Sequence, residues 1–391
     1  MRWLILVSLF VPSVAHAESW CAYPLWVHEW GVQSFDASGQ PSAPVSMPRY
    51  FHRDAAGATP SATPTRHLPP DSGMRALPVL HFYSTGSLSS PIPVGVEVGF
   101  THGEATLWYP QVNERRSASV ANSPTAAAQR RALLHQRQPN PNQLGTQRTL
   151  RSDPTSQLVW DRLLLTPAPQ HAQVNVNVPW VDALRELDAM WVNGASESER
   201  FVFYEATTRE RVALALRRGS TWRQGRRHVV VENTSRFAVH DVFVTHREGE
   251  RAFVFYAPSI PAGRSAGFVL EDHRVSDLPA ATRGRLRTQL VDPGQPAPPT
   301  SYRWSSGCTM MREPALPVTS AEGHRLYAAE VDAILDIWAP RFFEQPGTTI
   351  TYREDTAYLD AVMPLSLYTD MYNFIKLRRM GLATWRNVPL P

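Results

Sequence analysis

The sequence contains very little lysine and cysteine. Lys376 is the single lysine among 39 lysine and arginine residues, and Cys21 and Cys308 are the two cysteines. The chain has no glycine-rich phosphate loop with its lysine and no dinucleotide fingerprint, which argues against nucleotide chemistry of those types. Two isolated cysteines lack the paired CxxC spacing of a cysteine zinc site.

Strong charge of one sign is also missing. The formal net charge is +4, and the arginines are spread along the chain without forming a basic stripe. We therefore predict no nucleic-acid partner. No internal apolar run approaches the roughly 20 residues that a membrane-spanning helix needs, so we predict no transmembrane segment in the mature chain.

The first residues have the order of a secretory signal. Arg2 is followed by an apolar run over residues 3–11, and Ala15-His16-Ala17 forms a small-residue cleavage site. We predict a signal peptide at 1–17, cleaved after Ala17, and a periplasmic or secreted protein; an uncleaved membrane anchor is the alternative. In an oxidising compartment Cys21 and Cys308 are expected to form a disulfide, with two buried thiols as the alternative.

Alternating apolar residues predict strands in the first two thirds of the chain. Between 94 and 100, valine and phenylalanine alternate with glycine and glutamate, and 105–109 follows a polar turn, which predicts a hairpin with 77–83 as its neighbour. Further short segments rich in Val, Phe and Tyr continue from 158 to 270. A short helix over 181–187 follows Pro179. The fold class we predict is mainly β, with β-sandwich-like packed antiparallel sheets.

A proline-rich break at 292–300 precedes a different pattern. One apolar helical stripe follows at Tyr327, Val331, Ile334, Leu335 and Trp338, behind capping-box spacing at Thr319 and Glu322. Segments 348–353, 358–368 and 373–380 are predicted as strands. The predicted organisation is a β-rich body at 18–291 with long loops at 54–73 and 111–153, and a small α+β part at 301–391.

Several segments together carry a resemblance to known proteins. VHEWGV at 27–32, LPVLHFY at 77–83, ATLWYP at 105–110 and ERFVFYEA at 199–206 precede the helical segment that starts at Leu326. In this order they resemble an uncharacterised family of secreted bacterial proteins, of myxobacterial and planctomycete type, with a near-N-terminal HEWG motif. The resemblance implies an exported protein and this domain layout, and it implies no activity. HEWG is usually followed by Thr-Phe in that family, where Val32-Gln33 stands here.

His28-Glu29-Trp30-Gly31 is the most distinctive motif. A histidine beside a glutamate offers a base with its orienting carboxylate, or two metal ligands. On a strand, however, successive side chains point to opposite faces, so the two cannot share one ion. The competing interpretation is structural, with His28 or Glu29 bonded internally and Trp30 in the core. His81 and His102 are candidates to join His28 through tertiary contacts.

Other motifs favour ordinary structural roles. Residues 263–267 match GxSxG, but a strand follows where the nucleophile elbow requires a helix. His240 and His246 lie roughly 20 Å apart on one predicted strand and cannot chelate together. Asp332 and Asp336 point away from the apolar stripe, whereas Glu330 borders it and is the acid expected to be partly buried there.

Twelve tryptophans, Trp108 among them, could stack on ligands or fill the core. Our leading hypothesis is a non-catalytic binding or envelope-associated protein, with Trp30, His81, His102 and Trp108 as candidate binding residues and a glycan or protein of the cell envelope as the partner class. The alternative is a secreted, metal-assisted hydrolase using His28 and Glu29. A carbohydrate-binding module is the third hypothesis. The sequence specifies no cofactor and leaves metal content open.

Overall fold

The computed structural model describes residues 24–40, 42, 47–53, 73–84, 91–101, 103–116, 146–148, 156–175, 178–208, 211–219, 228–269, 271–274, 278–298, 324–369 and 374–389. Several predictions fall outside these residues: the signal peptide at 1–17, the Cys21–Cys308 disulfide, His102, and the capping box at Thr319 and Glu322. Most of the two predicted loops, 54–73 and 111–153, also lies outside them.

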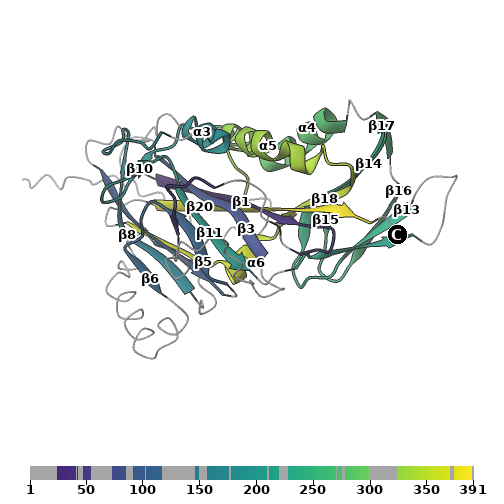
Figure 1. The fold of residues 1–391 in the computed structure, drawn as a ribbon, viewed down its shortest axis with the longest axis horizontal. Coiled ribbons are helices and arrows are strands. Elements are labelled where there is room, and N and C mark those ends of the chain that lie inside the picture. The colour runs from purple at the N-terminus through teal and green to yellow at the C-terminus, as the bar shows by residue number, and fades with distance from the viewer. Residues whose placement is uncertain are drawn as a thin grey trace, which may run out of the picture.

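A large sheet runs through the molecule (Figure 1). Among the described residues its order is β17-β15-β14-β18-β20-β1-β3-β11-β5-β2. In chain order these strands are β1 (Pro24–Phe35), β2 (His52–Arg53), β3 (Gly73–Ser84), β5 (Ala105–Tyr109), β11 (Val202–Thr208), β14 (Val239–Glu248), β15 (Arg251–Ile260), β17 (Glu271–Arg274), β18 (Gly347–Glu354) and β20 (Phe374–Val388). β1 lies near the middle, parallel to β20 and antiparallel to β3, so the two ends of the described chain meet there.

Two smaller sheets cover one face of the large sheet, one toward each end. The first contains β4 (Ile92–Phe100), β6 (Glu114–Arg116), β7 (Thr146–Arg148), β8 (Ser156–Thr166), β9 (Trp191–Asn193), β10 (Ser198–Glu199) and β19 (Leu365–Thr369). The second contains β12 (Leu214–Arg218), β13 (His228–Asn233) and β16 (Ser265–Val269). Leu377 of β20 belongs to the core under the first of these sheets, and Ala383 belongs to the core under the second. The mainly β prediction with packed antiparallel sheets is confirmed.

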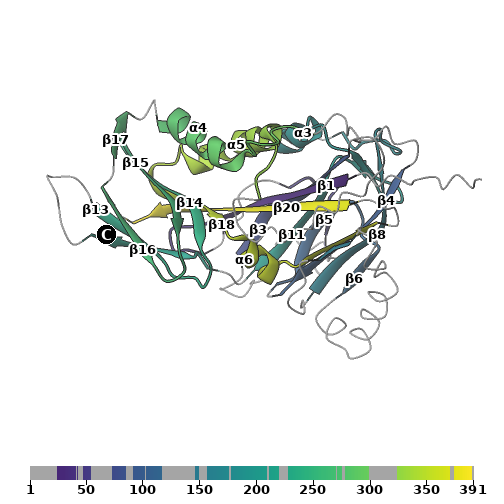
Figure 2. The same cartoon turned by 180° about the vertical axis from the view of Figure 1, so that it is seen from behind.

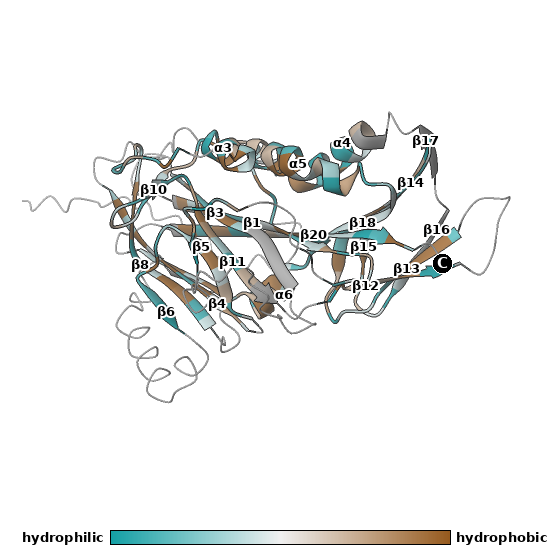
Figure 3. Cartoon of the chain, in the orientation of Figure 1, coloured by the Kyte–Doolittle hydropathy of each residue, from teal (hydrophilic) through white to brown (hydrophobic). Residues whose placement is uncertain are grey.

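Helices cover the opposite face. α3 (Pro179–Arg185), α5 (Ala328–Phe342) and α4 (Leu278–Leu290) form a row over the large sheet, as both views show (Figures 1 and 2). Their buried side chains share one core with Trp30, Val79 and Phe203 of the sheet. α5 is mostly apolar and α4 is more hydrophilic, as Figure 3 shows. α6 (Thr356–Val362) lies on the side of the smaller sheets, where Leu359 approaches Gly381 of β20.

The predicted helical stripe is confirmed. The side chains of Tyr327, Val331, Ile334, Leu335 and Trp338 are all at most 1% exposed. The helix begins after Tyr327, whose backbone N–H donates to Glu330 Oε2 at 3.0 Å. This bond satisfies one of the donors left free at a helix start. The helix continues past Pro340 and ends at Phe342.

The predicted hairpin over 94–109 is wrong. β4 and β5 are both strands, but β4 pairs with β8 and β19, whereas β5 pairs with β11 and β2. β4 and β5 therefore belong to different sheets, and apolar residues of both strands face the core between the sheets. Alternation identified each strand correctly, but it carries no information about the partner strand.

Two further elements differ from the prediction. Residues 356–362 form α6 instead of the start of a strand, because the Asp355 carboxylate caps the helix by accepting from the Ala357 N–H at 2.8 Å. Helix α4 was not predicted. The described C-terminal residues share sheets with the body: β18 and β20 belong to the large sheet, and β19 belongs to the first small sheet.

Candidate functional site

Strand β1 divides the HEWG motif between the two faces of the large sheet. His28 and Trp30 point to the helical layer, where Trp30 joins the core under α5. Glu29 points to the opposite face, the face on which Val27 packs against the first small sheet. The two side chains point to opposite faces, as the period of two along a strand predicts, and they belong to two separate buried polar clusters.

The Glu29 cluster is an ion pair with Arg379 of β20. Arg379 Nε donates to Glu29 Oε2, and Nη2 donates to Glu29 Oε1 at 3.0 Å. The Tyr204 hydroxyl of β11 also donates to Oε1. The two charged residues are direct neighbours, because Glu29 and Arg379 are paired in the parallel register of β1 and β20.

The remaining donors of Arg379 are also satisfied. Nη1 donates to Asp360 Oδ1 of α6 at 2.8 Å, and Nη2 donates to the Met363 carbonyl at 2.7 Å. Burial alone lowers the pKa of Arg379, but the Glu29 carboxylate outweighs it, so the pKa is raised. Every polar side-chain atom of Glu29 and Arg379 therefore has a partner, and the network joins β1, β20, β11 and α6.

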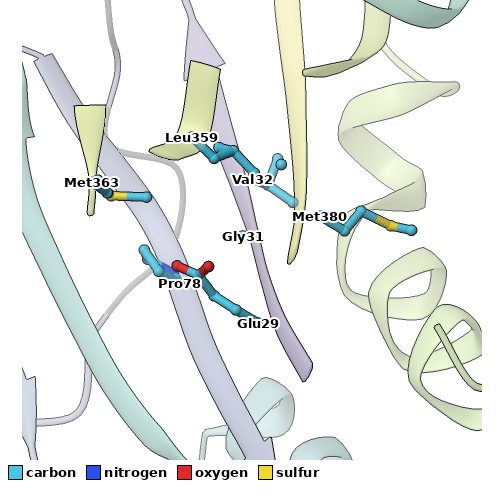
Figure 4. Close-up of a pocket in the computed structure, with 8 residues that line it drawn as sticks. Glu29, Gly31, Val32, Pro78, Leu359, Met363 and Met380 are labelled. Atoms are coloured by element: carbon cyan, nitrogen blue, oxygen red, sulfur yellow. The ribbon is translucent and has the colours of Figure 1, made fainter. Parts of the chain in front are cut away.

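A small cavity lies beside Glu29, between β1, β3, β20 and α6 (Figure 4). Its volume is about 10 Å³, at the lower bound for a single water molecule. Figure 4 shows the Glu29 carboxylate pointing away from the helical layer, toward the side on which Met363 lies. A cavity of this size admits no substrate to the carboxylate.

The His28 cluster lies on the other face, under the start of α5. His28 Nδ1 lies 2.6 Å from Glu330 Oε2, and neither side chain is more than 1% exposed. Burial raises the pKa of Glu330, but the nearby imidazoles, His28 first, lower it by more, so the pKa is below its usual value. The same carboxylate accepts from the Tyr327 N–H, so it ties α5 to β1.

His81 is the cross-strand neighbour of His28. The two are paired in the antiparallel register of β1 and β3, which puts both rings on the helical face. His81 Nδ1 lies 3.8 Å from Glu330 Oε1, too far for a hydrogen bond. Burial lowers the pKa of His81 to about 4, with the Glu330 carboxylate opposing that shift. Of the two histidines proposed to join His28, the structure brings His81 to it, and His102 lies outside the described residues.

Aromatic rings enclose the His28 cluster. The Tyr327 ring centroid lies 4.4 Å from that of His28, and the Tyr83 centroid lies 5.3 Å from it. The Trp30 ring stacks on His81 with centroids 6.3 Å apart. Burial, with the nearby Glu330 carboxylate, raises the pKa of Tyr83 well above its usual value. His28 and His81 are both 0% exposed, so this cluster is closed to solvent.

The candidate tryptophans are core residues. Trp30 is 1% exposed, and Trp108 of β5 is 3% exposed with the Arg115 guanidinium 4.7 Å above its ring. Within the described ranges no tryptophan is exposed. A surface row of tryptophans, which the carbohydrate-binding hypothesis requires, is therefore not formed by these residues.

The GxSxG segment is a turn between strands, as predicted. β15 ends at Ile260, Gly263 has a φ of +64°, and Ser265 begins β16 in an exposed position. On α5, Asp336 is exposed and Asp332 is partly exposed, which agrees with the predicted solvent-facing side, and they pair with Arg283 and Arg287 of α4.

Two histidine–carboxylate pairs lie nearer the surface. His52 Nε2 lies 2.7 Å from Glu197 Oε1, and these side chains are 30% and 19% exposed. His240 Nε2 lies 3.2 Å from Asp355 Oδ2, and both side chains are about one fifth exposed. Solvent therefore reaches both of these imidazoles, in contrast to the two buried histidines.

Sequence analysis missed the partners that define both clusters. Arg379 lies 350 residues from Glu29, and only the parallel pairing of β1 with β20 joins them. Glu330 was identified as the acid beside the apolar stripe, and this position was the sequence feature that pointed to its burial. Tyr204 lies in a strand whose alternation predicts burial but not the bond of its hydroxyl.

No protein-family model matches this chain, and no curated protein matches its sequence. No helix among the described residues is long and apolar enough to span a membrane. The geometry of the two clusters therefore carries the functional argument. Chemically, both clusters cross-link layers of the fold: one joins the large sheet to α6, and the other joins it to α5.

Proposed function

We propose that this chain is an exported, non-catalytic protein that binds a ligand of the cell envelope. In this proposal its HEWG motif has a structural role and links elements inside the fold. The observation that carries the proposal is the enclosure of both charged motif residues. His28 is 0% exposed and Glu29 is 3% exposed, and each bonds to a partner on another element. Export rests on the N-terminal sequence and on the resemblance to secreted proteins.

The hydrolase alternative places His28 and Glu29 in one reaction centre. Their opposite orientations argue against that centre, since a base and its orienting carboxylate must be within hydrogen-bond reach of each other. Glu29 is also held by Arg379 and Tyr204, which occupy both of its oxygens. These contacts favour binding over hydrolysis.

One experiment compares binding and turnover on the same panel of envelope glycans, peptides and esters. We expect the purified protein to retain at least one envelope component without cleaving any, and Glu29→Gln to leave the bound component unchanged wherever the variant is folded. The export part is checked by mass spectrometry of the protein from the periplasm or medium, where a chain starting at Glu18 is expected. Hydrolysis by the wild type that is lost in a folded Glu29→Gln variant would contradict the proposal and support the hydrolase alternative.

A further inference from the structure

The His28 cluster contains polar atoms that the fold leaves without partners. In the part of the chain that the structure describes, His28 Nε2 and both ring nitrogens of His81 have no hydrogen-bond partner. Glu330 Oε1 and the Tyr83 hydroxyl also lack a partner at normal hydrogen-bond distance, although the two side chains are close enough for Glu330 to raise the pKa of Tyr83. All four side chains are at most 3% exposed. A buried polar group without a partner costs about 1–3 kcal/mol, and such groups commonly mark an ion or a water molecule.

The side chains around this point are metal ligands by chemical type. Two imidazoles and one carboxylate are a donor set that suits zinc and related divalent transition metals. Each donor stands on a rigid element: His28 on β1, His81 on β3, and Glu330 in the first turn of α5. The two histidines are directly opposite each other on one face of the sheet, a position from which both can reach one ion.

The distances are close to those that an ion requires. Metal–ligand bonds of about 2.0–2.1 Å in tetrahedral geometry place neighbouring donor atoms about 3.3 Å apart. His28 Nδ1 and Glu330 Oε2 are 2.6 Å apart, and His81 Nδ1 and Glu330 Oε1 are 3.8 Å apart. As the side chains stand, no group of three His, Cys, Asp or Glu residues in the described part of the chain could hold a metal ion. A rotation of the Glu330 carboxylate that changes each of these two distances by less than about 1 Å would bring both to the tetrahedral value.

We propose that His28, His81 and Glu330 bind one divalent transition-metal ion of the zinc class, which has a structural role under α5. One coordination position remains for the Tyr83 hydroxyl or a water molecule. The ion enters as the protein folds, because the formed cluster has no opening to solvent. The metal hypothesis drawn from the sequence combined His28 with Glu29. In the proposed site Glu330 takes the place of Glu29, because Glu330 lies on the same side of β1 as His28.

His81→Phe is the most informative variant. The ring of His81 makes no hydrogen bond and lies beside Trp30 and Phe201, so phenylalanine fits the surroundings chemically. Without a metal, removing two unpartnered nitrogens leaves the melting temperature unchanged or raised. With a metal, the variant loses a ligand and its melting temperature falls. The two accounts therefore predict opposite signs.

The test uses the full mature chain, purified without chelators and analysed by elemental mass spectrometry. We expect about one zinc-class ion per chain in the wild type. We expect less than a tenth of that in His81→Phe, and an unchanged content in the control His52→Gln, which alters the surface pair with Glu197. Protein unfolded with a chelator and refolded with Co²⁺ should show the visible absorption of a tetrahedral ion, and its melting temperature should exceed that of protein refolded without metal.

Two results would overturn the proposal. One is wild-type protein that contains no stoichiometric metal and takes up neither Zn²⁺ nor Co²⁺ on refolding, in which case a buried water occupies the cluster. The other is His81→Phe that is folded and retains the full metal content. Neither result bears on envelope binding, so the proposed function and this site fail independently.

Discussion

The two faces of β1 carry buried polar clusters that differ in completeness. On the Glu29 face, Arg379, Tyr204 and Asp360 form a network around Glu29. Every polar side-chain atom of Glu29 and Arg379 has a partner in it. On the His28 face, Glu330 pairs with one histidine, while the ring nitrogens of His81 have no hydrogen-bond partner among the described residues. The complete network on the Glu29 face acts as a structural link between the elements that it joins. The incomplete cluster on the His28 face is the one that the proposed ion would complete.

The largest expected effect comes from opening the closed cluster. Arg379→Met leaves the Glu29 carboxylate buried without its cation, and we expect the free energy of unfolding to fall by about 3–5 kcal/mol. Urea denaturation measures the loss. The matched control is Arg378→Met on the adjacent residue, whose side chain is 18% exposed and pairs with Asp292; it should cost about 1 kcal/mol. Equal losses in the two variants would contradict a special role for the Glu29 cluster.

Removing both charges should restore much of that loss. The double variant Glu29→Leu with Arg379→Met replaces a buried pair by apolar groups of similar size, which is often tolerated. A double-mutant cycle is expected to give a coupling energy of at least about 2 kcal/mol between the two positions. Strictly additive losses would show that the pair is not coupled in the folded protein.

Glu205 of β11 is another buried carboxyl group, and burial dominates its pKa. It is 1% exposed, and burial raises its pKa to about 8, although the charge of Arg53 and a hydrogen bond with Thr106 oppose the shift. Since the folded state holds this proton more tightly than the unfolded chain, the stabilisation is present below about pH 4.5 and is lost as the pH rises through 8.

Glu205→Gln keeps the shape of the side chain and removes this titration. We expect wild type and variant to be equally stable near pH 4.5, and the variant to be more stable by about 4 kcal/mol at pH 9. Urea unfolding across this pH range measures the difference. A difference that does not change with pH would contradict the raised pKa.

The smallest effect concerns the packing around the Glu29 cavity. A Cβ atom at Gly381 would lie 2.3 Å from Glu354 Oε2 and 2.8 Å from Leu359 Cδ2. Gly381→Ala is therefore expected to destabilise the protein by about 1–3 kcal/mol in thermal or urea unfolding. Gly284→Ala is the control on α4, where a Cβ meets nothing within 4 Å, and it should stabilise the protein by about 0.5–1 kcal/mol. A neutral Gly381→Ala would mean that Glu354 and Leu359 can move aside.

Local patterns predicted local features of this fold well. The stripe from Tyr327 to Trp338 identified α5, and the period of two along a strand predicted that His28 and Glu29 face opposite ways. These properties depend on neighbours within a few residues. They could therefore be derived before any partner was known.

The partners could not be derived in this way. Arg379 reaches Glu29 because the last strand of the described chain pairs in parallel with the first, and no local pattern specifies that pairing. The strands β4 and β5 were assigned to one hairpin although they belong to different sheets, because a polar four-residue turn also permits a crossing between sheets. Both clusters depend on pairings of this kind, which explains why the motif alone did not define them.

The enclosure of the motif is tested most directly by chemical modification of histidines in the folded protein. Diethyl pyrocarbonate labelling with peptide mass spectrometry compares His28 and His81 with His52 and His240 in one sample. The structure predicts rapid labelling of His52 and His240, and labelling of His28 and His81 only after unfolding. Labelling of His28 in folded protein at the rate of His52 would contradict the account, because it would show that solvent reaches the motif.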